Sequence, residues 1–279
     1  MSQAGPPGWV AAQDPLISAD YNGWWRRSFG LLHAAWKPMA TVLGLATLLD
    51  LAVTMPATLR FEAAQRDARE RIEAAGDQTD FTLFLAGAGE FAAATAVAGL
   101  IYVLATLIAA RMVIDAALGR TDGSRPAAAA ARRFPAMIGW SVPALLLAVV
   151  AFALCFLPLL YVGAVLLVLP VVVLVERGNA IGRCFGLFHA DIGAAISRVA
   201  TIAALSLAGL VVVNLITTVI LVASGSSLAD RPVPAIVAEV ILQGVYTFAI
   251  GMITTPMLVT AYADLRARRE PFTSAELSS

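Results

Sequence analysis

Six long runs of apolar residues constrain the fold of this chain more than any other feature. Each run holds about twenty mostly apolar residues, the length that an α-helix needs to cross a hydrocarbon layer of about 30 Å. The runs cover residues 36–58, 93–114, 138–157, 159–175, 199–223 and 235–262. Helices are favoured because each one satisfies its own backbone polar groups in lipid. The sequence therefore predicts an all-α fold, a polytopic membrane helix bundle of about six transmembrane helices spanning residues 23–263.

Composition points to the same fold class. Apolar residues make up 59% of the chain and charged residues 14%, whereas soluble proteins have about 45–50% and about 25%. Basic and acidic residues number 19 each, so no overall positive field recruits nucleic acid. We expect membrane lipids as partners, with a membrane-protein partner as a further candidate, and no nucleic acid.

Two short segments repeat one another at an offset of 156 residues. Residues 27–34 read Arg-Ser-Phe-Gly-Leu-Leu-His-Ala and residues 183–190 read Arg-Cys-Phe-Gly-Leu-Phe-His-Ala, so six of the eight are identical. Each copy also has bulky apolar residues at the spacing of one helix face. These are Trp25, Phe29, Leu32 and Trp36 in the first copy and Ile181, Phe185, Phe188 and Ile192 in the second. We expect amphipathic interfacial helices near 23–36 and 180–192, each followed by a crossing helix.

The polar side of each copy supplies the candidate contact residues. Arg27 and His33 in the first copy match Arg183 and His189 in the second. Such side chains suit contact with anionic headgroups or with a partner, but the same helices can simply pack on the crossing helices, and the sequence leaves both open. Neither His has another His or a carboxylate four residues away, so we expect no metal site and no cofactor.

Asp50 is the acidic residue that lies nearest the middle of a predicted crossing. Ionisable residues are costly in hydrocarbon and are functional candidates for that reason. Asp50 has two interpretations: a transport or proton-linked role, or an internal hydrogen-bonded contact between helices. Glu90 and Glu239 are placed near the outer ends of their helices, where water reaches them.

The segments outside the crossings are polar. Residues 1–22 contain three prolines and predict a disordered cytoplasmic tail, residues 264–279 predict a second cytoplasmic tail, and residues 60–80 predict an exposed, charged helical arm. Arg198 is expected to snorkel from the start of its helix to the surface. Arg111 and Asp115 lie one turn apart and are expected to pair.

The distribution of basic residues predicts the orientation in a bacterial plasma membrane. With the N-terminus inside, the inner segments hold fourteen Lys and Arg residues and the outer segments hold five. Short cytoplasmic segments carry the excess of Lys and Arg in membrane proteins. Six crossings then place both termini in the cytoplasm.

No pattern of catalytic residues is present. The sequence has no Gly-x-Ser-x-Gly elbow, no phosphate-binding loop and no dinucleotide fingerprint. Cys155 and Cys184 are interpreted as small apolar residues. We therefore expect a membrane-organising or partner-binding protein that is not an enzyme, with a small-molecule or lipid transporter, or a permease accessory subunit, as the alternative.

Three segments together carry a family resemblance. They are Arg27-Ser28-Phe29 after the proline-containing tail, Pro170 followed by the Glu176 to Phe185 segment, and the chain from Pro256 to Glu270. With these segments the chain resembles the membrane domain associated with bacterial glycerophosphoryl diester phosphodiesterases and related six-helix membrane proteins of unknown function, common in actinobacteria. In that family the phosphodiesterase activity belongs to a separate soluble domain, so the resemblance implies a membrane fold here and no catalysis.

Overall fold

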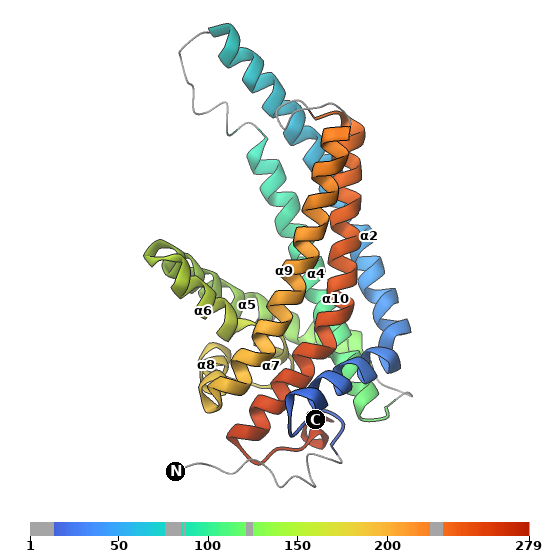
Figure 1. Cartoon of the computed structure of the whole chain (residues 1–279), viewed down its shortest axis with the longest axis vertical. Helices are drawn as coiled ribbons and strands as arrows, with labels where there is room; N and C mark the ends of the chain where they lie inside the picture. The colour runs from blue at the N-terminus through green and yellow to red at the C-terminus, as the bar shows by residue number, and fades with distance from the viewer. Residues whose placement is uncertain (1–13, 76–84, 86, 121–124, 224–230, 279) are drawn as a thin grey trace. The chain divides into compact units, whose positions relative to one another are not determined.

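The computed structural model describes residues 14–75, 85, 87–120, 125–223 and 231–278. These residues are helical apart from short connections (Figure 1). The elements are α2 (Tyr21–Ala75), α4 (Ala88–Ala117), α5 (Pro126–Leu154), α6 (Phe156–Leu166), α7 (Leu169–Val175), α8 (Ala180–Ala190), α9 (Ile192–Ala223), α10 (Val233–Arg269) and the short 3-10 helix η1 (Ser274–Ser278). The all-α prediction is confirmed.

Six helical stretches in the described part of the chain are long and apolar enough to cross a membrane. They are Tyr21–Ala74, Ala88–Ala117, Pro126–Leu154, Leu157–Val175, Ile192–Ala223 and Val233–Arg269. Five of them extend beyond the predicted runs because the helices continue into polar segments. The fourth consists of α6 and α7, which are separate helices. Only Cys155 separates α5 from α6, and Pro158 lies inside α6.

The chain divides into two compact units. Unit 1 comprises Met1–Leu43, Leu104–Ser206 and Ile250–Ser279, and unit 2 comprises Gly44–Val103 and Leu207–Ala249. Helices α2, α4, α9 and α10 therefore contribute to both units, whereas α5 to α8 belong to unit 1 alone.

Unit 1 contains the larger described core. Helix α5 packs on α6 and α7, and α8 packs on α6 and α7 in turn. A second cluster joins α2, α9 and α10 through four buried side chains: Trp24, Ile202, Met257 and Ala261.

Unit 2 packs through small residues and aromatic rings. A Cβ added at Gly209 of α9 would lie 2.7 Å from the Tyr246 ring of α10, so only glycine permits this approach. Near the other end of the unit, the Phe61 and Phe91 rings stack at 5.0 Å between centroids. Close approach at small residues is the usual way in which membrane helices associate.

The two repeated segments have the same buried face, and it differs from the predicted one. Trp24, Ser28 and Leu31 are buried in the first copy, and Ala180, Cys184 and Leu187 are buried at the same offset in the second. The predicted face lies one residue further along the chain. Of the predicted face, Phe188 is buried as expected, whereas Phe29 and Trp36 are 39% and 47% exposed. The contact face combines the large side chains of Trp24, Leu31 and Leu187 with the small ones of Ser28, Ala180 and Cys184, which let the helix approach its neighbours closely.

The copies also differ in how they join the following helix. No break follows the first copy, because α2 continues from Tyr21 to Ala75, so the predicted separate helix near 23–36 is not present. The second copy forms α8 and stops at Asp191, whose Oδ1 accepts a hydrogen bond from the Ala194 N–H at 3.0 Å. Asp191 thus caps the N-terminus of α9. The equivalent residue in the first copy is Ala35, which has no side-chain acceptor.

The described parts of the two predicted tails pack into unit 1. Leu16 and Ile17 are buried before α2 begins, and Phe272 and Leu277 are buried after α10 ends. We call residues 14–20 together with residues 264–278 the terminal clasp. Asp14 joins its two halves, because its carboxylate accepts hydrogen bonds from the backbone N–H groups of Leu16 (2.9 Å) and Ser274 (2.8 Å). The expectation of disorder was therefore wrong for residues 14–22, while residues 1–13 lie outside the described part.

The charged arm predicted over residues 60–80 forms the last part of α2, which ends at Ala75. Residues 76–80 lie outside the described residues. The arm is not wholly solvated, since Ala68 is buried and Glu62 pairs with Arg231. Arg66 donates to the backbone carbonyl of Arg231. Within unit 2 this segment therefore contacts the start of α10.

Candidate functional site

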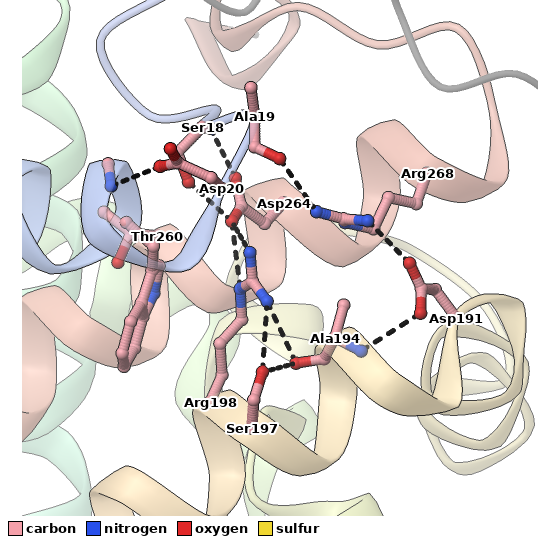
Figure 2. A network of polar contacts seen from close by, with 12 residues as sticks. Ser18, Ala19, Asp20, Asp191, Ala194, Ser197, Arg198, Thr260, Asp264 and Arg268 are labelled. Carbon is pink, nitrogen blue, oxygen red and sulfur yellow. Dashed lines mark hydrogen bonds and ion pairs between the residues drawn. The ribbon is translucent and has the colours of Figure 1, made fainter.

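The most deeply buried charges in unit 1 form an ion pair between α9 and α10. The Arg198 and Asp264 side chains are 2% and 0% exposed, and Arg198 Nη2 lies 2.6 Å from Asp264 Oδ2. Figure 2 shows the guanidinium directed at this carboxylate. Ser18 completes the arrangement, because its backbone N–H and its hydroxyl donate to Asp264 at 2.6 and 2.8 Å. The prediction that Arg198 snorkels to the surface was wrong.

A second ion pair extends this network toward the solvent. Arg268 of α10 lies 2.5 Å from the Asp191 carboxylate, the cap of α9 (Figure 2). The hydrogen bond from the Ala194 N–H, together with Arg268, holds the pKa of Asp191 below its ordinary value. The network therefore joins the terminal clasp to α9 and supplies no unpaired catalytic group.

A separate cluster of charges surrounds Arg183. Its guanidinium lies 2.7 Å from Glu176 and 2.5 Å from Glu270. Arg266 also lies 2.7 Å from Glu270. Burial acts to raise the pKa of Glu270, but the hydrogen bonds from Arg183 and Arg266 outweigh it and lower that pKa. Arg183 is therefore neutralised within the protein.

A pocket of about 260 Å³ opens beside this cluster, at the turn between α7 and α8. Its lining comes from α5, from the end of α7 and from the start of α8. The lining residues are Arg133, Ala136, Trp140, Val172, Val173, Glu176, Arg177, Gly178, Asn179, Ala180 and Arg183. Gly178 has a φ of +119°, which suits glycine, and Asn179 caps α8 through a 2.9 Å hydrogen bond from the Gly182 N–H.

The arginines and histidines predicted from the repeat have different surroundings. Arg183 lines the pocket but is paired, while Arg27 is partly exposed on α2. His33 is exposed. His189 connects α8 to α6: its Nδ1 donates to the Phe185 carbonyl at 2.8 Å, and its Nε2 lies 3.2 Å from the Tyr161 hydroxyl. The structure does not give the four residues a common site.

In the described part of the chain, no group of three or more His, Cys, Asp or Glu side chains is placed to hold a metal ion. Cys184 is buried in α8, and burial together with the charge of Glu176 raises the pKa of its thiol to about 12. The thiol is therefore protonated at neutral pH and chemically quiet.

Asp50 is half-buried in the unit 2 part of α2, and its carboxylate has no hydrogen-bond or ion-pair partner among the described residues. A pocket of about 140 Å³ in unit 2 lies elsewhere. It is lined by Asn214, Thr217, Thr218, Ile220, Leu221, Arg231, Ala235 and Glu239. Asp50 is not part of that lining, so the structure does not join it to the other polar groups of the unit.

Sequence reasoning missed Arg133 and Arg177 as site residues. The available signal was Arg132-Arg133-Phe134, which partly repeats the Arg-x-Phe pattern of the two copies. Arg177 lies in a turn whose conformation depends on Gly178, and no periodic pattern marks that turn. Comparison with known proteins adds no assignment, since no family model, no curated protein and no solved structure matches this chain.

Proposed function

We propose that this chain is a non-catalytic integral protein of the bacterial plasma membrane that contacts anionic lipid, or a membrane-protein partner, with the basic surface of unit 1. Both termini are cytoplasmic in this proposal. The protein serves as a membrane-organising or partner-binding component.

The separation of charge between the two units carries the proposal. Unit 1 holds fourteen basic and nine acidic residues, a net charge of +5, whereas unit 2 holds five basic and ten acidic residues, a net charge of −5. The fourteen basic residues of unit 1 are the same ones that the sequence assigns to the inner segments, so the packing units coincide with the predicted sides. A surplus of Lys and Arg is typical of cytoplasmic segments, and the inner leaflet carries the anionic headgroups that attract them.

Cysteine accessibility tests the orientation. Cys155 and Cys184 are first replaced by serine, the residue that the repeat itself places at the position equivalent to Cys184. In intact cells a membrane-impermeant maleimide should then label Ala74→Cys, while Ser124→Cys should react only after the membrane is opened. The opposite labelling would overturn the proposed orientation.

Tryptophan fluorescence tests the lipid contact, because all five tryptophans lie in the unit 1 part of the sequence. The protein is reconstituted in vesicles that contain brominated phosphatidylglycerol or brominated phosphatidylcholine at equal mole fraction. Stronger quenching by phosphatidylglycerol is expected. Equal quenching would remove the anionic-lipid part of the proposal.

A transport function is the second candidate, and the unit 2 pocket is the observation that favours it. Asn214, Thr217 and Thr218 give this pocket polar groups within the otherwise apolar unit 2 part of α9. If the pocket is part of a transport path, Asn214→Cys should react with a water-soluble thiol reagent and be protected by the transported solute. Absence of labelling at this position in reconstituted protein would argue against it.

A further inference from the structure

The pocket at the α7–α8 turn has an unbalanced positive charge. Three arginines line it, and Glu176 is the one carboxylate in its lining. Arg183 is already paired with Glu176 and Glu270. Arg133 and Arg177 have no hydrogen-bond or ion-pair partner among the described residues. Two guanidinium groups at one pocket are thus left with free donors.

The shape and lining of the pocket suit a small anion with a substituent. Its volume of about 260 Å³ equals roughly eight or nine water molecules at about 30 Å³ each. Trp140 adds an aromatic side chain that, like other tryptophans, is suited to the boundary between lipid and water. The Asn179 Oδ1 is already used to cap α8, so the side chain offers its amide donor to a ligand.

The guanidinium group of arginine matches the geometry of a phosphate group better than the compact ammonium group of lysine does. Its planar fork donates two parallel hydrogen bonds to two oxygens of one phosphate, and such charge-assisted bonds are about twice as strong as neutral ones. We propose that the pocket lined by Arg133, Arg177 and Trp140 binds a phosphate group of a phosphodiester or phosphomonoester. The proposal rests on the proposed function, because it names the ligand group that the basic surface recognises.

Two sources can supply this group: the headgroup of an anionic phospholipid or a soluble phosphate compound. Binding is therefore measured on the full chain in detergent by isothermal titration calorimetry with three probes, dihexanoyl phosphatidylglycerol, dihexanoyl phosphatidylcholine and inorganic phosphate. Saturable binding of phosphatidylglycerol that exceeds the other two identifies the lipid source. Saturable binding of inorganic phosphate with equal or higher affinity identifies a soluble ligand and removes the lipid source.

The variants decide whether the pocket is the site. Arg133→Gln and Arg177→Gln should each weaken binding of the preferred probe by about tenfold or more, since a hydrogen bond to a charged group contributes about 1.5–3 kcal/mol and each 1.4 kcal/mol is tenfold. Arg132→Gln is the matched control. It lies next to Arg133 on α5, is exposed, and does not line the pocket. Its binding should stay within about twofold of the unsubstituted chain.

The outcomes separate this inference from the proposed function. Unchanged binding in the Arg133→Gln, Arg177→Gln double variant, or an equal loss in Arg132→Gln, would overturn the pocket as the site. Absence of saturable binding by all three probes would overturn it as well. The fluorescence preference for phosphatidylglycerol, which depends on the whole basic surface, is read in the same double variant. If the double variant keeps the preference for phosphatidylglycerol, the proposed function stands although the pocket is not the site of that preference. If the unsubstituted chain shows no preference for phosphatidylglycerol, the proposed function itself is rejected.

Discussion

Arg198 brings a guanidinium group into the interior of unit 1, and its stability there depends on Asp264. Both side chains are almost completely buried, and Asp264 accepts two further hydrogen bonds from Ser18. A buried ion pair contributes little net stability relative to apolar residues, but removal of one partner leaves an uncompensated charge. A single substitution at either residue of this pair should therefore cause a large loss of stability.

The expected result for Asp264→Asn is a loss of about 3–5 kcal/mol of unfolding free energy, measured by denaturant unfolding in mixed micelles. Glu90→Gln is the control, because its partner Arg60 is 70% exposed and the pair lies at the surface of unit 2. Exposed pairs contribute about 0–1 kcal/mol. An Asp264→Asn protein as stable as the control would show that water or another group compensates Arg198.

At this scale the sequence predicted contacts between residues close in the chain and missed the distant ones. Arg111 and Asp115, four residues apart, pair as predicted, with 3.2 Å between Nε and Oδ1. Arg198 and Asp264 are separated by 66 residues, so each was assigned to the surface from its own neighbours. The partner of a buried charge is set by tertiary packing, which one sequence does not reveal.

At the scale of helices, the repeat gives two copies of one motif in different surroundings. Gly30 and Gly186 are equivalent residues of the two copies. A Cβ added at Gly30 would contact no atom within 4 Å, whereas one at Gly186 would lie 1.5 Å from Arg269 Nη1. The same substitution therefore has different consequences in α2 and α8.

Gly30→Ala should raise the unfolding free energy by about 0.5–1 kcal/mol, because alanine loses less backbone entropy in a helix than glycine. Gly186→Ala should give no such gain, since the Arg269 side chain has to leave its place over α8. Combination of Gly186→Ala with Arg269→Ala should restore the gain, which a double-mutant cycle measures. Equal gains in the two single variants would mean that Arg269 has no preferred position on α8.

The positions of the helices were predictable apart from their polar ends. The faces that pack against neighbouring helices were not. The prediction selected the bulkiest apolar residues of the repeat, yet Ser28 and Cys184 lie on the buried face. Ser28 is satisfied there by its contacts with the Thr260 hydroxyl at 2.8 Å and the Trp24 carbonyl at 2.9 Å. In lipid, large apolar side chains also belong on the outer surface, so size alone does not identify the core.

For the molecule as a whole, composition and periodicity were sufficient for the six apolar helices, because hydrocarbon thickness sets the length of the apolar run that each one needs. The division into two units and the packed terminal clasp were not foreseen. The units depend on packing between segments far apart in the chain, and the clasp depends on hydrogen bonds between such segments, such as the one between Asp14 and Ser274. The basic pocket was missed for the same reason, since α5, α7 and α8 each supply part of its lining.

Acid should destabilise unit 1 through Asp191 and Glu270. The pKa of each carboxyl is lower in the folded protein than its ordinary value of 3.8 or 4.5. The stabilisation is therefore complete above the ordinary values and is lost as pH falls through the lowered folded values. The thermal unfolding midpoint should fall between pH 5 and about pH 3, and the Asp191→Asn, Glu270→Gln double variant should show a shallower fall. A parallel decline in the double variant would assign the acid sensitivity to other carboxyls.

The order of synthesis gives the Arg198–Asp264 pair a second consequence. At about 5–20 residues per second, Arg198 is made roughly 3 to 13 seconds before the residue that neutralises it. The interval between synthesis of Ser18 and synthesis of its acceptor Asp264 is longer still, since 246 residues separate them. A chain truncated before residue 264 therefore lacks the carboxylate that neutralises Arg198, together with the C-terminal half of the terminal clasp.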